Sequence, residues 1–326
     1  MLDRRLGPIR CKESLRKLIR LLASDSNARV QRSTVQRSNG GWVISFTVER
    51  SVKHRRPRRP NAVVGVDVGL ARLATLSTGQ QYVNARPLQA ALRTLRRLQR
   101  QLDRQRRQGN PGNYLADGRM RLGPKAWAKS ARMLRTEQLI ARLHESVANL
   151  RRHQAHTLTT ALTREFGGIG VETLSVKNLM GNRRLARHIA DVGWGMVLAQ
   201  LAYKTYWSDG SILVAADRFY PSSKTCSACG LVKAKLGLAE RVFTCDDTLC
   251  GRVQDRDENA ACNLARLAYQ HAQAEGNPMS YVARIGRFTL TARGGQVSLV
   301  ELDQHSSVKR EASPDASQRR EALAAV

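Results

Sequence analysis

Apolar and polar positions alternate near the start of the chain, which is the pattern of a half-buried strand. The alternation runs through residues 41–50, and its apolar members are Trp42, Ile44, Phe46 and Val48. Residues 29–36 precede it across a Ser-Asn-Gly-Gly sequence, so the two segments predict a β-hairpin. Residues 12–23 carry apolar residues on one side and basic ones on the other, which predicts a short amphipathic helix.

A second group of strands is predicted farther along the chain. Residues 63–69 are apolar except for one aspartate, and residues 72–78 and 80–84 follow it on either side of a Thr-Gly turn. These three segments predict a meander. Two further apolar runs, 168–173 and 211–217, predict strands of the same core.

Helical periodicity separates the two groups of strands. Leucines recur every three or four positions from Leu88 to Leu102, which predicts a long amphipathic helix. A second helix is predicted over residues 127–166, with core candidates Leu139, Leu143, Leu150, Leu158 and Leu162. The Gly-, Asn- and Pro-rich stretch 109–124 divides them, so residues 86–166 predict a helical hairpin.

The remaining segments are shorter. Helices are predicted over residues 194–208 and 257–272, and a polar, basic loop over 174–193. Beyond residue 277 only weak strand-like alternation remains, and from Gln304 the composition is that of a disordered tail. Four tryptophans fall in periodic segments and are predicted to be core residues: Trp42, Trp127, Trp194 and Trp207.

Charge gives the first indication of a partner. The chain has 55 Lys+Arg against 26 Asp+Glu, a formal charge of +29. An excess of this size repels itself unless a polyanion neutralises it, and the arginine fork fits phosphate oxygens. An Arg-rich genome would explain arginine over lysine, but not basic over acidic residues. The charge therefore predicts a nucleic-acid partner.

Candidate nucleic-acid contacts lie in three places: a basic, proline-broken stretch at 53–60, the polar face of the first long helix, and the polar loop. They are Arg55, Arg56, Arg58, Arg59, Arg93, Arg97, Arg100, Arg104 and Lys177. The stretch 53–60 also predicts a linker at a domain boundary. A nuclear-localisation run there, or a merely solvated helix face, are the alternatives.

The sequence argues against a membrane or secreted protein. Hydrophobic residues make up 42% of the chain, which is enough to bury a core. The longest apolar runs, such as 211–216, are far too short to span a bilayer, and the chain opens without a charged-then-apolar leader. We therefore expect no membrane partner and a cytoplasmic location.

Cysteine spacing predicts a metal site. Four of the six cysteines fall in one short stretch: Cys226, Cys229, Cys245 and Cys250. Two short pairs can turn four thiolates towards one cation, which is the closed site typical of structural zinc. Gly230 and Gly251 follow the second cysteine of each pair and allow tight turns. The wider second gap leaves iron or an imperfect site open, and four unliganded core cysteines are the other alternative.

Three acids stand where a charge is unusual. Asp67 interrupts the apolar strand 63–69, Glu172 ends the strand 168–173, and Asp257 begins the last helix. Singly, an ion pair or a helix cap would explain each of them. Flanking glycines at 65 and 69 leave space beside Asp67 for a backbone or a phosphate to approach.

The order of the elements favours a common site. Three meandering strands, then helix, strand, helix, strand and helix, follow the RNase H-like plan, in which the first strand, the fourth strand and the last helix each bring an acid to one point. Three close carboxylates repel, so divalent cations are needed to keep them ionised. Two magnesium ions about 4 Å apart could then activate water and stabilise the leaving oxygen of a phosphodiester.

Several segments form an ordered set of motifs: Gly65–Gly69 with Leu73–Gly79, Val171–Met180, Phe219–Gly230 and Asp255–Ala261. As a set they resemble the TnpB (OrfB) proteins of bacterial insertion sequences, long called transposases, over roughly residues 8–271. The resemblance implies an RNA-guided DNA endonuclease related to the compact type V CRISPR effectors. Its partners would be a guide RNA from the transposon end and a double-stranded DNA target.

The resemblance also implies the site residues. A split RuvC triad would map onto Asp67, Glu172 and Asp257, with magnesium or manganese as the catalytic cofactor. A structural zinc ribbon would map onto the four clustered cysteines. In a bacterium such a protein would be cytoplasmic and nucleoid-associated.

The expected fold is α/β, with an RNase H-like (RuvC) mixed sheet, a helical-hairpin insert, a zinc-ribbon insert and a partial N-terminal β-barrel. The expected domains are a partial wedge (OB-like) barrel, the nuclease core, the zinc ribbon, the last core helix and a largely disordered tail: 1–60, 61–217, 218–254, 255–272 and 273–326. Family members carry a longer N-terminal part with a helical recognition lobe, so residues 1–60 resemble only the second half of that barrel. Glu258 and Cys262 also depart from the family pattern in the last helix.

We therefore predict a metal-dependent DNA endonuclease guided by RNA. One alternative is a truncated relative that binds nucleic acid as a regulator or decoy without cutting it. A decayed remnant and a junction-resolving nuclease are two others. No serine or cysteine nucleophile has a base nearby in sequence, and no glycine-rich phosphate loop with a lysine occurs, so those chemistries are set aside.

Overall fold

The computed structural model describes residues 11–38, 41–50, 54–237, 239–274, 291–293 and 296–298. The chain divides into two compact units, Met1–Lys53 with Phe288–Val326, and His54–Arg287. Most of the tail predicted for residues 273–326 lies outside the described residues. Each unit is described by itself.

The unit that contains the N-terminus carries the predicted helix and hairpin. Helix α1 (Arg16–Ser24) precedes strands β1 (Arg29–Ser38) and β2 (Gly41–Glu49), which pair antiparallel. Two short strands, β10 (Thr291–Arg293) and β11 (Gln296–Ser298), pair with each other. Because each described sheet of this unit has two strands, the partial barrel stays a prediction.

The predicted core position of Trp42 is wrong. Its side chain is 74% exposed, although Ile44 and Phe46 on the same strand are partly covered. A two-stranded ribbon gives each side chain cross-strand neighbours but little area that could cover a large ring.

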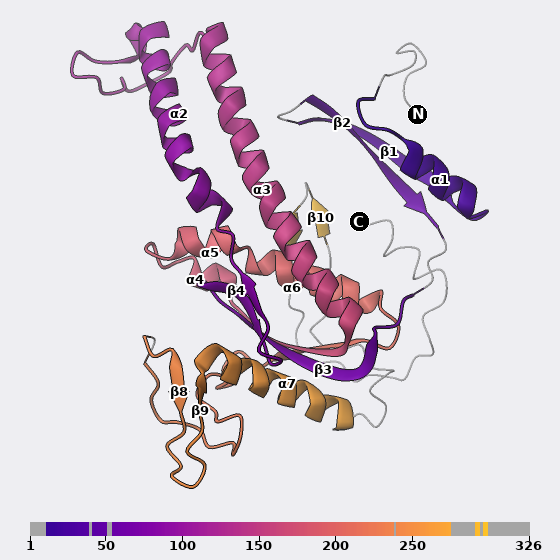
Figure 1. Cartoon of the computed structure of the whole chain (residues 1–326). Helices are drawn as coiled ribbons and strands as arrows, with labels where there is room; N and C mark the ends of the chain where they lie inside the picture. The colour runs from indigo at the N-terminus through magenta and orange to yellow at the C-terminus, as the bar shows by residue number, and fades with distance from the viewer. Residues whose placement is uncertain are drawn as a thin grey trace. The chain divides into compact units, whose positions relative to one another are not determined.

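The larger unit is built on a mixed sheet of five strands in the order β5-β4-β3-β6-β7 (Figure 1). Strands β3 (Arg59–Val68), β4 (Arg72–Leu76) and β5 (Gln81–Val83) form the predicted antiparallel meander. Strands β6 (Phe166–Glu172) and β7 (Ile212–Ala216) continue the sheet parallel to β3. The topology places the ends of β3 and β6 next to each other.

Helices cover both faces of this sheet (Figure 1). Helices α3 (Ala131–Glu165) and α6 (Trp194–Tyr206) pack on one face, and α7 (Arg256–Ala274) packs on the other. The core below α3 and α6 is apolar, and its fully buried members include Val64, Val66, Leu158, Leu162, Val197 and Leu201. Side chains alternate along β3, so Gly65 and Asp67, which lie between the buried Val64, Val66 and Val68, face α7.

Helix α7 lies very close to the sheet because glycines face it. A Cβ at Gly65 would stand 1.8 Å from the carbonyl oxygen of Ala261, and one at Gly170 would stand 2.2 Å from that of Leu264. Any larger residue at either position would push the helix away. The space predicted beside Asp67 is therefore filled, at Gly65, by helix backbone.

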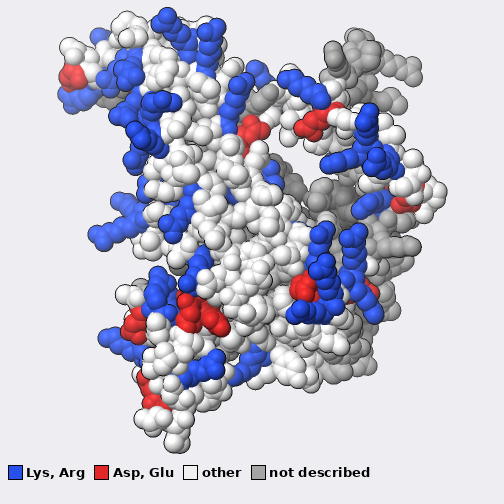
Figure 2. Space-filling view, in the orientation of Figure 1, with Lys and Arg blue, Asp and Glu red and all other residues white. Residues whose placement is uncertain are grey.

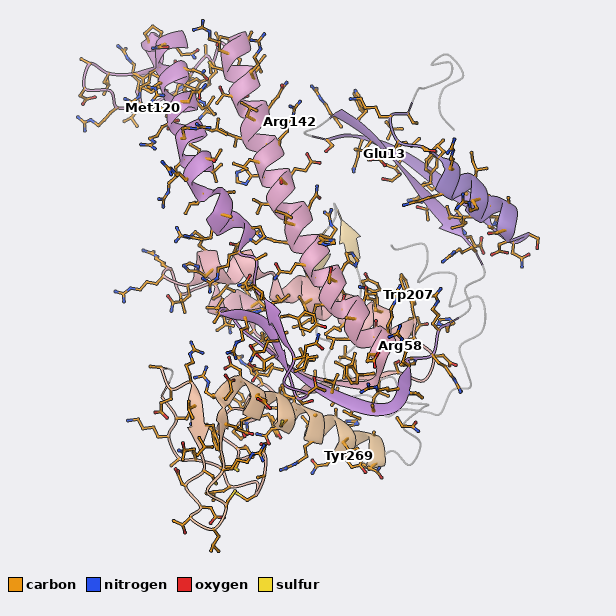
Figure 3. The ribbon with its side chains drawn as sticks, in the orientation of Figure 1. Glu13, Arg58, Met120, Arg142, Trp207 and Tyr269 are labelled. Carbon is orange, nitrogen blue, oxygen red and sulfur yellow. The ribbon has the colours of Figure 1, made fainter. Side chains whose placement is uncertain are left out.

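The predicted helical hairpin consists of α2 (Pro87–Gly109) and α3, joined by a turn that contains η2 (Pro111–Asn113). Figure 3 labels Met120 in this turn. Helix α3 begins at Ala131 and not at residue 127, because Ser130 caps it and accepts a hydrogen bond from the Met133 amide at 3.3 Å. Across the described residues, no helix is long and apolar enough to cross a membrane.

Some predicted core positions of the hairpin are exposed. Leu158 and Leu162 are buried as expected, whereas Leu139 and Leu150 are 48% and 52% exposed. The outer part of α3 packs on α2, whereas the sheet and α6 cover its inner part. Trp127 is also 41% exposed and contacts Tyr114 edge to face, so its predicted core position is wrong.

The loop predicted over residues 174–193 is wrong in part. It contains two short helices, α4 (Val176–Leu179) and α5 (Ala186–Val192). Ile189 and Val192 of α5 are buried in the main core. Elements this short give too few turns for a periodic pattern in the sequence.

The basic stretch predicted as a linker is held on the larger unit from His54 onwards. Nδ1 of His54 lies 2.7 Å from the carbonyl oxygen of Trp207, and the Arg58 amide donates to the carbonyl of Arg164 at 2.9 Å. Figure 3 labels Arg58 and Trp207 in this region. The backbone contacts make this stretch the lead-in to β3, so the linker prediction is wrong for residues 54–59.

Candidate functional site

Two of the predicted acids stand side by side at one end of the mixed sheet. Strands β3 and β6 are parallel neighbours, and Val66 is paired with Val171. Asp67 and Glu172 each follow one residue later, so they lie at the same level on adjacent strands. The register therefore brings together residues that are far apart in the sequence.

The third acid reaches the same place from α7. Asp67 shares a strand face with Gly65, and Glu172 shares one with Gly170, since side chains alternate along a strand. Both glycines face α7 at close range. Asp257 lies in the first turn of that helix. The close packing of α7 thus directs all three acids into one cluster.

The cluster is electrostatically strained without a cation. Burial raises the pKa of Asp67 well above 3.8, and the carboxylates of Glu172 and Asp257 raise that pKa further. Among the described residues, none donates a hydrogen bond to the Asp67 carboxylate. A bound cation would relieve this repulsion.

The three carboxylates do not all lie within 4.8 Å of one another. In the described part of the chain, the one group of three or more possible ligand atoms within 4.8 Å of one another is the four cysteines. Carboxylates that share two cations about 4 Å apart need not approach each other so closely. Carboxylate oxygens are the ligands that magnesium and manganese prefer, so this donor set fits either ion.

Sequence reasoning missed three residues that contact these acids: Ser222, Arg256 and Arg241, whose Nη1 lies 4.0 Å from Oδ1 of Asp257. The Ser222 hydroxyl donates to Oε1 of Glu172 at 2.6 Å. Nη2 of Arg256 lies 3.5 Å from Oδ1 of Asp257 and partly offsets the charge. No local pattern announces the serine, because it lies far from Glu172 in sequence.

Asp255 supports the acid on α7. Its Oδ1 accepts the amides of Asp257 and Glu258 at 2.9 and 3.2 Å, and its Oδ2 pairs with Arg72 at 3.0 Å. Burial alone would raise the pKa of Asp255, but Arg72 and the two amides lower it. The sequence Asp-x-x-Glu at 255–258 is a helix-start signal that could have revealed this role.

The four predicted cysteines converge in the segment around β8 (Val242–Thr244) and β9 (Val253–Asp255), which pair antiparallel. Sγ of Cys226 lies 3.8 Å from that of Cys250, and Sγ of Cys229 lies 3.6 Å from that of Cys245. Thiolates around zinc at about 2.3 Å would stand about 3.8 Å apart in a tetrahedron. The sulfur positions therefore fit zinc and are too far apart for a disulfide.

Backbone amides favour a thiolate at Cys226, whereas burial and the neighbouring cysteines raise the pKa of the Cys245 thiol to about 12. Although burial opposes it, the amides of Cys229 and Ala228 lower the pKa of the Cys226 thiol to about 7. The turns depend on Gly230 and Gly251, whose φ angles are +84° and +53°. This left-handed conformation is easy for glycine and confirms the turn role predicted for both.

The predicted nucleic-acid contacts lie on several surfaces of the larger unit. Arg93, Arg97, Arg100 and Arg104 are exposed along α2, and Figure 2 shows Lys and Arg side chains along the α2–α3 hairpin. Arg55 and, in α4, Lys177 are also exposed.

The other basic candidates have acidic partners. Arg56 pairs with Asp209 at 3.2 Å, and Arg58 and Arg59 pair with Glu165 at 3.7 and 3.0 Å. Both acids are at least partly exposed, so these pairs can exchange for phosphates. The α2 arginines are the stronger candidates, because no acidic partner is found for them among the described residues.

Two stretches of the chain match known family models. Residues 44–183 match the model of the OrfB family, described as a probable transposase, and residues 194–264 match the Cas12f1-like TNB domain. The recognition of the TnpB (OrfB) family from the sequence motifs is therefore confirmed.

Individual relatives carry a more specific name, "Putative RNA-guided DNA endonuclease". The chain is 37% identical to one from Mycobacterium tuberculosis over 89% of its length, and 35% identical to one from Streptomyces pristinaespiralis over 78%. It is 32% identical to InsQ of Escherichia coli (strain K12) over 74% of its length. The chain spans 59%, 57% and 57% of these relatives, respectively.

A solved structure shares the fold. A Cas12f1–sgRNA–target DNA complex matches 81% of this chain and 50% of its own, with a TM-score of 0.50 and 15% sequence identity. At this identity the likeness supports the mixed α/β architecture alone.

Proposed function

We propose that this protein is an RNA-guided, metal-dependent DNA endonuclease of transposon origin. The observation that carries the proposal is the meeting of Asp67, Glu172 and Asp257 from β3, β6 and α7 in one cluster. The name shared by its relatives, "Putative RNA-guided DNA endonuclease", supports DNA as the substrate. We further propose that the sheet with α7 is an RNase H-like (RuvC) nuclease core.

In this proposal the three carboxylates hold the catalytic metal. Bound magnesium or manganese would supply an activated water and a stabilised leaving oxygen for phosphodiester hydrolysis. Asp67 accepts no hydrogen bond from the described residues, so its oxygens are free for coordination. Asp255 holds the first turn of α7, which keeps Asp257 in place.

The four cysteines would hold a structural zinc. All four ligand positions are taken by sulfur, so a tetrahedral ion there has no position for substrate. The zinc would fix the fold of the segment between β7 and α7, which joins the strand layer to the helix that carries Asp257.

Guide RNA and target DNA would lie against the basic surface. The α2 arginines repeat along one exposed helix face, as contacts to successive phosphates require. Arg55 and Lys177 extend the candidate surface, and the paired arginines at 56, 58 and 59 can join it. With such partners the protein would work in the cytoplasm on nucleoid DNA.

Asp67→Ala tests the proposal. The protein is expressed with its native flanking DNA, the co-purified RNA is sequenced, and cleavage of a matching DNA duplex is measured. We expect cleavage to fall by roughly 100-fold or more, because a metal ligand is lost. Nucleic-acid affinity should stay within about twofold, because the basic surface supplies it.

Asp209→Ala is the matched control, since it removes an exposed carboxylate outside the cluster. It should cut as fast as the unchanged protein. Equal cleavage by the Asp67→Ala protein would sink the proposed centre. A discrete RNA without any DNA cleavage would instead support the truncated binding protein.

A further inference from the structure

The segment 221–227, here called the neck, joins the end of β7 to the cysteine cluster. Ser222 in this neck is 2% exposed. Its hydroxyl donates to Oε1 of Glu172 at 2.6 Å, within the range of a well-formed O–H···O hydrogen bond. The neck therefore touches the acidic cluster directly.

Helix α7 binds the neck through the side chains of Asn259 and Asn263, both of which are 0% exposed. The Asn263 side-chain amide donates to the carbonyls of Ser222 and Thr225 at 2.8 and 2.6 Å. Oδ1 of Asn259 accepts the Ser227 amide at 2.9 Å. Both asparagine side chains are buried, so water cannot replace the neck as their hydrogen-bond partner. These hydrogen bonds therefore fix the position of the neck backbone on the helix.

The cysteine cluster holds the other end of the neck. Cys226 is itself a neck residue, and its amide donates to the Leu231 carbonyl at 2.8 Å. Arg266 of α7 donates to the Ser227 carbonyl. Ser222 is thus fixed between the helix that carries Asp257 and the candidate zinc ligands.

We propose that Ser222 is a positioning residue for Glu172. This inference rests on the proposed function, because it concerns the metal affinity of the same acidic cluster. The hydroxyl occupies one oxygen of the carboxylate and fixes its rotation, so the other oxygen is set for a cation. Partners of this kind, one shell beyond the ligand, usually carry a 10- to 100-fold share of metal affinity.

The adjacent Ser223 offers a matched control. Its carbonyl accepts a hydrogen bond from Asn259 at 3.4 Å, whereas its hydroxyl makes no hydrogen bond to any described residue. Ser223→Ala therefore removes a hydroxyl from the same neck without touching Glu172. Ser222→Thr keeps the hydroxyl and serves as the conservative variant.

The test is a titration of the full chain with Mn²⁺, in which electron paramagnetic resonance counts the unbound ion. We expect Ser222→Ala to weaken Mn²⁺ binding roughly 10-fold, and Ser223→Ala and Ser222→Thr to stay within about threefold of the unchanged protein. The zinc content should be the same for all four proteins, and each should still unfold in one cooperative thermal transition.

Unchanged or tighter Mn²⁺ binding by a folded Ser222→Ala protein would overturn the inference. If Ser222→Ala loses zinc or fails to fold, Ser222→Gly and Ser222→Thr decide, because the inference requires weak binding by the first and restored binding by the second. Glu172→Gln distinguishes failure of the proposed function from failure of the role proposed for Ser222. If Glu172→Gln binds Mn²⁺ as well as the unchanged protein, the proposed function fails; if Glu172→Gln alone is weakened, only the role of Ser222 fails.

Discussion

Asp67 is a single residue whose charged form destabilises the folded protein. It lies on a strand whose neighbours Val66 and Val68 are buried, and two other carboxylates face it. Burial and repulsion both disfavour its charged form, which raises its pKa. The folded protein therefore bears a cost at this position that a bound cation would remove.

This cost predicts that Asp67→Asn stabilises the metal-free protein. Because the folded-state pKa lies above the unfolded value of 3.8, the folded chain keeps a proton that the unfolded chain loses. Stability therefore falls as the pH rises from about 3.8 through the folded pKa. Asparagine removes that fall.

The expected gain at neutral pH is about 1 kcal/mol, or ~2–4 °C in Tm for a unit of this size. Calorimetry in the presence of a chelator for magnesium measures it. Added Mg²⁺ should raise the Tm of the unchanged protein and not that of Asp67→Asn. A lower Tm for the variant without metal would contradict the account.

At the scale of elements, the helical hairpin depends on one buried acid. Asp191 of α5 accepts the amides of Leu88 and Gln89 at 2.9 and 3.0 Å, at the start of α2. Arg151 of α3 donates to the same carboxylate at 2.9 Å. Three helices thus meet at a side chain that is 5% exposed.

We expect Asp191→Ala to destabilise the protein by about 3 kcal/mol, because it leaves Arg151 unpaired in a mostly buried position and uncaps α2. Urea unfolding monitored by circular dichroism measures the change. Asp209→Ala breaks an exposed pair and should cost less than about 1 kcal/mol. Equal losses for the two variants would show that Asp191 has no special role.

The elements were predictable to different degrees. The long helices α2 and α3 and the strands β3 and β6 carry many residues with one period, so their pattern is clear. The helices α4 and α5 are too short for such a pattern, and their position depends on contacts with the core and with α2. The start of α3 was missed because one serine cap, and not the apolar period, decides it.

At the scale of the whole molecule, a formal charge of +29 favours binding to a polyanion. Each phosphate contact releases condensed counterions, so affinity falls steeply with salt. The exposed arginines of α2 should account for part of that dependence, whereas Arg56, Arg58 and Arg59 already have acidic partners.

We expect joint replacement of Arg93, Arg97, Arg100 and Arg104 by alanine to lower the steepness of log affinity against log salt by roughly 3.6 on B-form DNA, about 0.9 for each phosphate contact. Fluorescence anisotropy at several salt concentrations measures the slope. Joint replacement of Arg56, Arg58 and Arg59 is the comparison and should lower the slope by less than about 1. If both variants keep the original slope, nucleic acid binds elsewhere.

The sequence by itself determined the class of protein, its candidate acids and its candidate metal-binding cysteines. Cysteine spacing and an acid inside an apolar strand are local signals, because a few neighbouring residues already show the cost or the geometry. Exposure was different. Trp42, Leu139 and Leu150 fit the pattern of buried residues, yet the fold places too little around them to bury them.

Only the tertiary structure decided which residues support the site. The register of β3 with β6 and the close contact of α7 with the glycines place Asp67, Glu172 and Asp257 near enough to interact electrostatically. The bond from Ser222 to Glu172 joins residues 50 positions apart. Such a contact has no periodic signature, because it depends on how strands and helices pack and not on the order of residues within one element.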